Sequence, residues 1–536
     1  MLTFSAQRYP YASQRQSVFA RRGMVAASQP LAAEAGIDIM RRGGNAIDAA
    51  IATAAALTVV EPTGCGIGGD AFALVWVKGQ LHGLDASGHA PAALNIEAVR
   101  ASGAEAMPLY GWTPVTVPGC PAAWAELSRR FGRLPFAELL QPAISLAEEG
   151  FPLSPVVARQ WQTAYNDFSA KREPAMQAWF DTFLIDGKVP KAGELFRNPD
   201  QARTLKELAE TGCESFYRGA LAERIDAASR QGGGYLRQSD LQSYKPRWVE
   251  PISVNYRGYD VWEIPPSGQG LVALMTLQIL KGFDFDHRDS LSTWHRQIEA
   301  LKLAYSDGLH HITDPEHMRV AVADLLGEAY TQRRRALIGD TALEPKAGDP
   351  HASGTVYLAT ADAEGNMVSF IQSNYHGFGS GVVVPGCGIA LQNRGQEFSL
   401  DPGHANTLQP GKKTFHTIIP GFISHNGQPV GPFGVMGGYM QPQGHVQMVM
   451  NLVDFGLNPQ AALDAPRWQW LGGMKVGIEQ AASRDLAAAL QGMGHQVEVA
   501  CDSVDYGRGQ IIVRDPVSGV LCGGTEPRAD SHIAVW

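Results

Sequence analysis

Two glycine-containing segments in the second half of the sequence have the residue types of an acyl-transfer site. In the first, Gly354-Thr355, a hydroxyl residue stands where a polar loop meets a predicted strand. In the second, Gly437-Gly438 forms a turn ahead of a predicted helix over 441–451. Paired glycines before a helix can present two backbone N–H groups to a developing negative charge, as an oxyanion hole does. Each feature is common by itself, but together they indicate nucleophilic catalysis.

The elements that must position these residues change in character at residue 354. Residues 335–354 contain many Gly, Pro, Ser and Asp with little periodicity, which predicts an exposed, mobile segment. Residues 355–375 form two strand-like runs around a four-residue turn at 363–366, which predicts a β-hairpin. The rest of the chain is rich in predicted strands, with helices near 445–455 and 484–490. We therefore divide the chain between residues 354 and 355.

The first part of the chain alternates between predicted strands and helices. Asn45 is the expected N-cap of an Ala-rich helix that ends at about Val60, before Pro62. Residues 118–230 show apolar residues at i, i+3 and i+4 and are predicted to be mostly helical. The remaining expected elements are strands at 23–28, 71–78, 81–85 and within 252–264, and helices at 30–42, 270–281 and 292–306.

Composition places the chain among globular proteins. Of 536 residues, 45% are hydrophobic and 18% are charged, which allows a large core and argues against disorder. The net charge is −9 with no basic half, which argues against a nucleic-acid or anionic-membrane partner. The six cysteines are far apart without a CxxC pair, and the chain has neither a signal-peptide pattern nor an 18-residue apolar run. We therefore expect a cytoplasmic protein with free thiols.

Two familiar motifs fail on their context. Residues 64–69 satisfy G-x-G-x-x-G, but a predicted helix precedes them and a predicted strand follows, the reverse of a dinucleotide site. We expect a tight turn there that brings the backbone close to a buried group. His310, His311 and Asp314 could suggest a metal site, but adjacent helical residues point about 100° apart. No metal or cofactor is expected.

Segments along almost the whole chain match one family in order. They include TVPGCPAAW (116–124), IPPSGQG (264–270) and GTVYLATADAEGN (354–366), and also 23–72, 377–398 and the pair Gly437-Gly438. They resemble the γ-glutamyltranspeptidase family of N-terminal-nucleophile hydrolases. The resemblance implies an α+β fold, a four-layer αββα sandwich whose two sheets take strands from both cleavage products. It also implies a proenzyme that cuts itself before Thr355, giving a heterodimer of a large subunit (1–354) and a small subunit (355–536), possibly dimerised further.

The resemblance also implies a mechanism. The Thr355 hydroxyl attacks the Gly354 carbonyl, and hydrolysis of the resulting ester frees the α-amine of Thr355. This amine, with an ordinary pKa of about 7.7–8.0, can take the proton of the hydroxyl on the same residue. By the same resemblance, Ser373 hydrogen bonds the nucleophile, and the Gly437 and Gly438 amides hold the oxyanion.

The residues expected to bind substrate depart from the transpeptidase pattern. Ser87 replaces an arginine, Tyr375 an asparagine, His416-Thr417 two serines, and Arg394 a glutamine, whereas the anion Glu397 is retained. Arg394 could pair with Glu397, or it could bind a substrate carboxylate through two parallel hydrogen bonds.

These replacements predict a smaller, anion-binding acyl site. Tyr375 and His416 are bulky, and Arg394 or His89 would favour a small anion. The profile resembles the branch that hydrolyses oxamate to oxalate and ammonia in purine (allantoin) degradation. The short segment 398–416 suggests an uncapped site and hydrolysis rather than transfer. The alternatives are a glutathione hydrolase or γ-glutamyltransferase, a glutaryl or cephalosporin-type acylase, and a catalytically dead scaffold. A small-molecule amide is the external partner expected.

Overall fold

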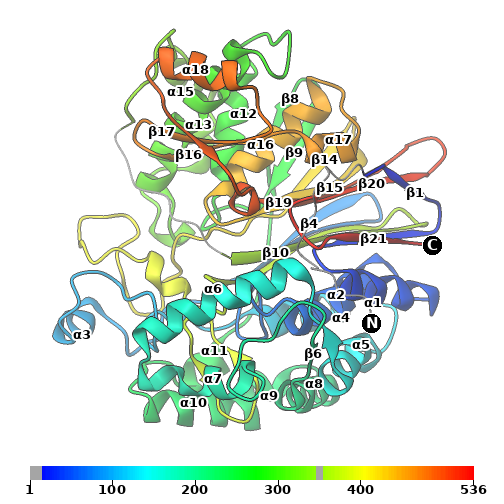
Figure 1. Ribbon diagram of the computed structural model, residues 1–536, viewed down its shortest axis with the longest axis vertical. Helices are drawn as coiled ribbons and strands as arrows, with labels where there is room; N and C mark the ends of the chain where they lie inside the picture. The colour runs from blue at the N-terminus through cyan, green and yellow to red at the C-terminus, as the bar shows by residue number, and fades with distance from the viewer. Residues whose placement is uncertain (1–14, 346–353) are drawn as a thin grey trace, which may run out of the picture.

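The protein is built in four layers, with two β-sheets stacked between two groups of helices (Figure 1). The computed structural model describes residues 15–345 and 354–536. Each sheet has seven strands, and every neighbouring pair within them is antiparallel. The predicted αββα sandwich is confirmed.

The sheet that carries the candidate nucleophile has the order β21-β2-β10-β11-β3-β4-β7. Its central hairpin is β10–β11, which the sequence predicted. The strands are β21 (His532–Val535), β2 (Gly23–Ala27), β10 (Gly354–Asp362), β11 (Met367–Tyr375), β3 (Asp70–Val77), β4 (Gln80–Ala86) and β7 (Arg247–Val249).

The second sheet has the order β1-β20-β19-β15-β14-β9-β8. Both sheets take strands from both sides of the 354/355 boundary, so neither part of the chain can form a complete sheet without the other. The strands are β1 (Val18–Ala20), β20 (Leu521–Thr525), β19 (Arg508–Arg514), β15 (Gln428–Met436), β14 (Gly421–His425), β9 (Tyr259–Glu263) and β8 (Ile252–Tyr256).

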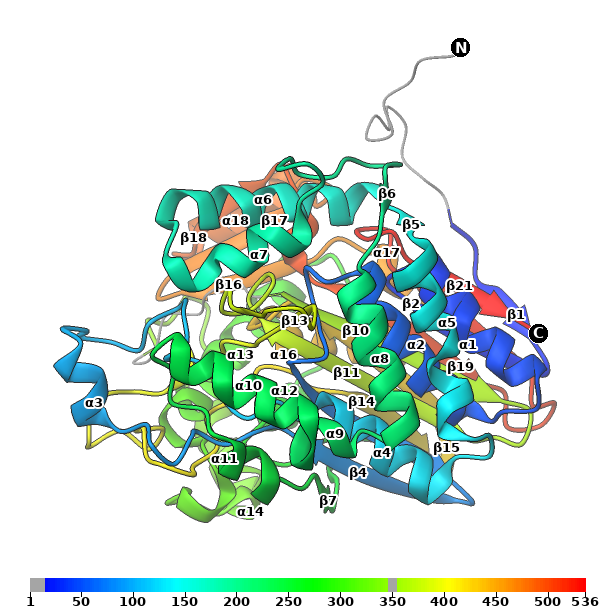
Figure 2. The same cartoon turned by 90° about the horizontal axis from the view of Figure 1, so that it is seen from below.

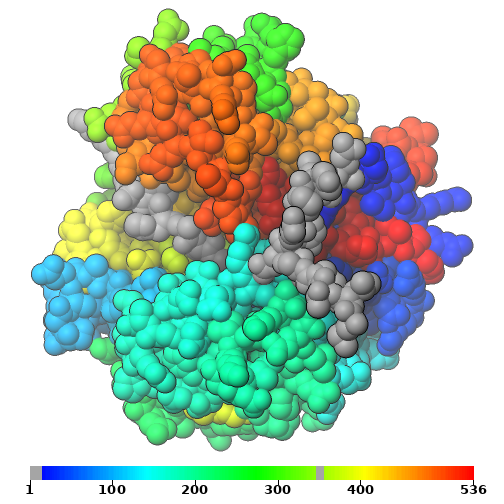
Figure 3. Space-filling view, viewed as in Figure 1, coloured from blue at the N-terminus to red at the C-terminus, as the bar shows by residue number. Residues whose placement is uncertain are grey.

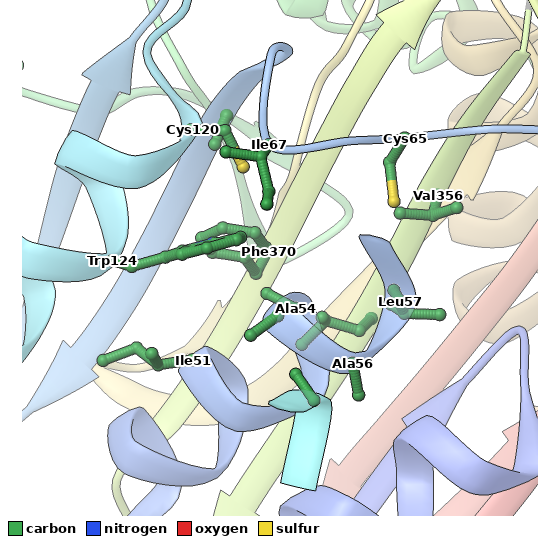
Figure 4. Packing of buried hydrophobic residues seen from close by; sticks show 14 of the residues in the cluster. Ile51, Ala54, Ala56, Leu57, Cys65, Ile67, Cys120, Trp124, Val356 and Phe370 are labelled. Atoms are coloured by element: carbon green, nitrogen blue, oxygen red, sulfur yellow. The ribbon is translucent and has the colours of Figure 1, made fainter. Parts of the chain in front are cut away.

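Helix α2 (Ala46–Val60) supports the hairpin from the outer layer. The Asn45 side chain accepts hydrogen bonds from the N–H groups of Ile47 and Asp48, so Asn45 is the N-cap that the sequence predicted. Every residue of α2 is buried, and all are apolar except Asp48, Thr53 and Thr58, as expected of a helix that is packed on all sides. In Figure 4 its side chains pack against Val356 and Phe370 of the hairpin and Trp124 of a neighbouring helix. The hydrophobic core therefore reaches Val356, the residue that follows Thr355.

The two outer layers contain most of the remaining helices. Beside α2 lie α1 (Pro30–Arg41), α4 (Cys120–Phe131), α5 (Phe136–Glu149) and α8 (Pro199–Thr211). The opposite layer consists of α12 (Gly270–Leu280), α13 (Leu291–His311), α15 (Glu328–Arg335), α16 (Met440–Val453) and α17 (Pro459–Asp464). The sequence predicted all of these except α15 and α17, which are short.

Smaller elements form lobes at the edges of the sandwich (Figures 2 and 3). The helical elements are α3 (Ile96–Ala101), α6 (Pro155–Lys171), α7 (Gln177–Phe183), α9 (Glu214–Arg218), α10 (Ala220–Gln231), α11 (Gln238–Ser243), α14 (Val322–Leu325), α18 (Arg484–Gly492) and 3₁₀ turns at 174–176, 315–317, 394–397 and 504–506. The strands are β5 (Phe151–Pro152), β6 (Leu195–Phe196), β12 (Val383–Val384), β13 (Ile389–Ala390), β16 (Trp468–Gly472), β17 (Lys475–Glu479) and β18 (Gln496–Ala500).

Three further expectations concern the chain as a whole. All six cysteines are free thiols. Within residues 15–345 and 354–536, no helix has the length and apolar character needed to cross a membrane. Of the segment expected to be exposed and mobile, residues 336–345 are mostly exposed, whereas 346–353 lie outside the described residues. The exposed part is nevertheless fixed at Gly339 and Leu343, whose carbonyls accept hydrogen bonds from buried side chains of α13.

Candidate active site

The Thr355 side chain lies at the start of the central hairpin and is fully buried. Its Oγ1 is 3.1 Å from Ser373 Oγ on the facing strand. Residues 354 and 356 pair with 375 and 372, so β11 has one extra residue opposite Thr355. Such a bulge turns a side chain out of the regular alternation, and bulges are frequent beside active sites. The Tyr375 N–H donates to Ser373 Oγ over 2.8 Å, which fixes the serine toward the threonine.

The G-x-G-x-x-G segment packs against this pair. A Cβ added to Gly64 would lie 3.1 Å from the Thr355 carbonyl oxygen, and one added to Gly69 would lie 2.5 Å from the Ser373 carbonyl oxygen. The helix α2 precedes the segment and the strand β3 follows it, as the sequence predicted. The expected tight turn with close backbone approach is therefore confirmed.

The second glycine segment lies between β15 and α16. Gly437 and Gly438 have φ angles of +137° and +58°, which side chains rarely tolerate. The Gly437 carbonyl accepts from Met440 N, in the first turn of α16. Because a trans peptide points its carbonyl and N–H in opposite directions, the Gly438 N–H points out of the helix start. Gln441 Nε2, in the same turn, lies 3.5 Å from Thr355 Oγ1, so this helix start faces the threonine.

Arg394 lies in a 3₁₀ turn over 394–397 and is fully buried. Its Nη1 donates to Thr417 Oγ1 over 2.7 Å, and its guanidinium lies 4.3 Å above the Tyr375 ring. Its Nε and Nη2 are buried and have no hydrogen-bond partner among the described residues. Burial lowers the pKa of Arg394, but an arginine remains charged. Two guanidinium donors are therefore available to an acceptor that residues 15–345 and 354–536 do not supply.

Glu397 accepts a hydrogen bond from a buried tyrosine. The Tyr439 hydroxyl donates to Glu397 Oε2 over 2.7 Å, and the Tyr375 hydroxyl, close to the same carboxylate, donates to Gln396 Oε1 over 3.4 Å. Burial raises the pKa of both hydroxyls far above their ordinary value, and the Glu397 charge raises them further. Both tyrosines are therefore neutral. The sequence left two roles open for Arg394, pairing with Glu397 or binding a substrate carboxylate. The hydrogen bond that Arg394 donates goes to Thr417.

His416 is a buried neighbour of Thr417, the residue that accepts from Arg394. Its Nε2 lies 2.9 Å from Asp70 Oδ2, and the Ile418 N–H donates to its Nδ1. These contacts define the Nε2–H tautomer. Burial, with the charge of Arg394, lowers the pKa of His416 well below its ordinary value, and burial raises the pKa of Asp70 to about 7. His416 is therefore neutral and held in one orientation, next in sequence to the threonine that accepts from Arg394.

The remaining expected substrate residues make other contacts. Ser87 Oγ donates to Asp85 Oδ1 over 2.6 Å, and Lys413 pairs with the other oxygen of Asp85. His89 is half-buried, with Nδ1 3.0 Å from the carbonyl oxygen of its neighbour Ala90. Substrate contacts of Ser87 and His89 stay predictions. Asp70, Gln269, Tyr439 and Gln441 were not predicted, although Gln269 stands in the IPPSGQG segment.

One group of side chains in the described part of the chain has the composition of a metal site. Potential ligand atoms of His295, Glu299 and His495 lie within 4.8 Å of one another. However, Lys302 Nζ donates to Glu299 Oε1 over 2.7 Å and lies 3.4 Å from His495 Nδ1. An ammonium already balances the carboxylate, so this group fits a buried hydrogen-bond network rather than a cation site.

Known proteins resemble this chain over most of its length. The family model described as Gamma-glutamyltranspeptidase matches residues 32–536. The chain is 38% identical to the oxamate amidohydrolase proenzyme of Klebsiella pneumoniae and 36% identical to the glutathione hydrolase-like YwrD proenzyme of Bacillus subtilis; each match covers 96% of this chain and 98% of the relative. The crystal structure of cephalosporin acylase from Bacillus halodurans is 59% identical with a TM-score of 0.97, covering 100% of this chain and 99% of that one.

Proposed function

Because this chain belongs to the γ-glutamyltranspeptidase family and is an amidohydrolase of that family, we propose that it hydrolyses the amide of a small substrate that carries a carboxylate. In this proposal the chain cuts itself between Gly354 and Thr355, and Thr355 then forms the acyl-enzyme. The first candidate substrate is oxamate, which would give oxalate and ammonia.

The observation that carries the proposal is the buried guanidinium of Arg394. A buried donor without an acceptor costs about 1–3 kcal/mol, and more when it is charged. A carboxylate accepts two parallel hydrogen bonds from an arginine, and Arg394 has two adjacent nitrogens, Nε and Nη2, in need of acceptors. The site is therefore complementary to an acyl group that ends in a carboxylate.

The state of Glu397 disfavours a γ-glutamyl substrate. Such a substrate carries an α-ammonium, which needs an anion. Here the Glu397 carboxylate already accepts from the buried Tyr439 hydroxyl, and the buried Tyr375 ring lies beside it. An ammonium would have to compete with this hydrogen bond. Oxamate has a carboxylate and no ammonium, so it matches both Arg394 and Glu397 as they stand.

The described groups fit an acyl-transfer mechanism. The freed α-amine of Thr355 takes the proton from Oγ1 as this oxygen attacks the substrate carbonyl. The Gly437 and Gly438 amides stabilise the oxyanion, and Ser373 holds Oγ1 in place. The amine returns the proton to the leaving nitrogen, ammonia departs, and an ester remains on Thr355. Water, losing its proton to the same amine, then hydrolyses the ester and frees the acid.

A second candidate is a longer carboxylate-bearing acyl group such as glutaryl. The 59% identity to the cephalosporin acylase from Bacillus halodurans favours it, because a glutaryl group would also present a carboxylate to Arg394. The buried rings of Tyr375, His416 and Tyr439 favour the shorter oxamate.

The test is a substrate panel on processed enzyme. We would measure ammonia release from oxamate and p-nitroaniline release from glutaryl- and γ-glutamyl-p-nitroanilide. The proposal expects the highest kcat/KM for oxamate; a higher value for the glutaryl anilide would select the second candidate. Efficient γ-glutamyl turnover that survives Arg394→Met would overturn the carboxylate-binding role of Arg394. Glu397→Gln serves as the matched variant, because it alters the neighbouring charge and leaves the guanidinium in place.

A further inference from the structure

Gln269 connects the two halves of the candidate site. It is fully buried immediately before α12. Its Nε2 donates to the Gly438 carbonyl over 2.8 Å and to the Thr417 carbonyl over 2.6 Å. The first acceptor belongs to a glycine of the proposed oxyanion hole. The second belongs to the residue whose hydroxyl accepts from Arg394.

The orientation of the Gln269 amide follows from its neighbours. Backbone carbonyls can only accept, so the group that faces both of them must be the NH₂ and not the oxygen. On the other side, the single proton of the Tyr305 hydroxyl is shared between two acceptors, Gln269 Oε1 at 3.0 Å and the Tyr439 carbonyl oxygen. The backbone N–H of Gln269 donates to the His416 carbonyl over 2.9 Å. The side-chain and backbone donors of this residue are therefore used to fix neighbouring segments.

The glycine segment needs such support. Two consecutive glycines with positive φ have more conformational freedom than any other pair of residues. Oxyanion donors stabilise the transition state only when they are already oriented, and a misplacement of about 1 Å can cost about 100-fold in rate. Among the described residues, Gln269 is the side chain that donates to a carbonyl of the Gly437-Gly438 pair.

We propose that Gln269 is a positioning residue that fixes the oxyanion loop at Gly438 and ties it to the Arg394–Thr417 anion site. This inference rests on the proposed site. Through Gln269, the segment at Thr417, which holds Arg394, and the loop at Gly438 share one connection. The residue touches no reacting atom, so it acts on the rate through the position of Gly438.

The experiment compares processed wild-type enzyme with Gln269→Met, which keeps the length of the side chain and removes both donors. The substrate is whichever amide of the panel the wild type hydrolyses fastest, so failure of the oxamate assignment leaves the test intact. We expect kcat to fall about 30- to 100-fold with KM within about threefold of wild type, because the oxyanion forms only in the transition state. Unchanged kcat, or a rise in KM alone, would overturn the inference.

Two further variants separate positioning from folding. Gln278→Met removes a glutamine-to-carbonyl hydrogen bond on the same helix, to Leu326, and is expected to leave kcat unchanged. Tyr305→Phe removes the hydroxyl beside Gln269 Oε1 with little change in packing, and it is expected to lower kcat by a smaller factor. If Gln269→Met fails to fold, an unchanged kcat in Tyr305→Phe would overturn the inference. Activity that persists in Thr355→Ala would instead refute the proposed site.

Discussion

Replacing Arg394 by methionine tests the electrostatic basis of the proposed specificity. The guanidinium is fully buried and has two unused donors, so a bound carboxylate would form a desolvated, charge-assisted pair with it. Truncating one partner of such a pair costs about 2–5 kcal/mol, which corresponds to about 30- to 4,000-fold in kcat/KM. In the free enzyme the substitution removes the hydrogen bond to Thr417 Oγ1 and the contact with the Tyr375 ring. It also removes the positive charge near the buried carboxyl groups of Asp70 and Glu397. We therefore expect a large loss of activity together with a lower Tm, because removing one partner leaves buried charge without compensation.

The assay compares oxamate with oxamide, its neutral counterpart, in ammonia-release measurements. The loss in kcat/KM caused by Arg394→Met is expected to be at least about tenfold larger for oxamate than for oxamide, because only oxamate forms a charge pair. Arg394→Lys keeps a point charge without the two-pronged geometry and is expected to fall between wild type and Arg394→Met. Equal losses for the two substrates would show that Arg394 supports the pocket without binding a carboxylate.

Three other perturbations have outcomes that the structure predicts. Wild-type protein of 57.7 kDa is expected to separate on denaturing electrophoresis into bands of about 38 and about 20 kDa, in proportion to 354 and 182 residues. The variant Thr355→Ala is expected to give one full-length band. Identical patterns for the two proteins would refute cleavage between Gly354 and Thr355. Burial raises the pKa of Glu61 to about 7 from 4.5, so its contribution to stability is complete below about pH 4.5 and is lost as the pH rises through about 7. The difference in Tm between Glu61→Gln and wild type should therefore increase from pH 5 to pH 8. The corresponding change in the free energy of unfolding has about 3 kcal/mol as its upper bound. A Tm difference that does not vary with pH would contradict the raised pKa of Glu61. Lys302→Met leaves Glu299 buried without its ammonium and is expected to destabilise by about 3–5 kcal/mol. Adding Glu299→Gln should restore part of the lost Tm, and no recovery would contradict a charge-pair origin.

The parts of the fold that depend on local signals could be predicted from the sequence. Asn45 before an Ala-rich run marked the start of α2, and the turn at 363–366 marked the β10–β11 hairpin. Both signals lie within a few residues of the element they define. The arrangement of the two sheets followed from the family resemblance, since strand order joins residues hundreds of positions apart and leaves no local pattern.

The partners of the candidate site residues could not be predicted, because they depend on contacts between distant segments. The spacing of Arg394 and Glu397 was compatible with an ion pair or with substrate binding. In the structure Arg394 donates to Thr417 and Glu397 accepts from Tyr439 at the start of α16, and neither contact leaves a local sequence pattern. The bulge opposite Thr355 depends in the same way on the pairing register of two strands.

Tyr375, which by the family resemblance stands where the transpeptidases have an asparagine, links these observations. Its ring lies under the Arg394 guanidinium, so its aromatic face supports the cation. The Nε and Nη2 of that guanidinium have no hydrogen-bond partner among the described residues, whereas Glu397 accepts from Tyr439. Under the proposed function, carboxylate recognition therefore does not require the loss of Glu397, because a tyrosine hydroxyl engages this residue in place of a substrate ammonium.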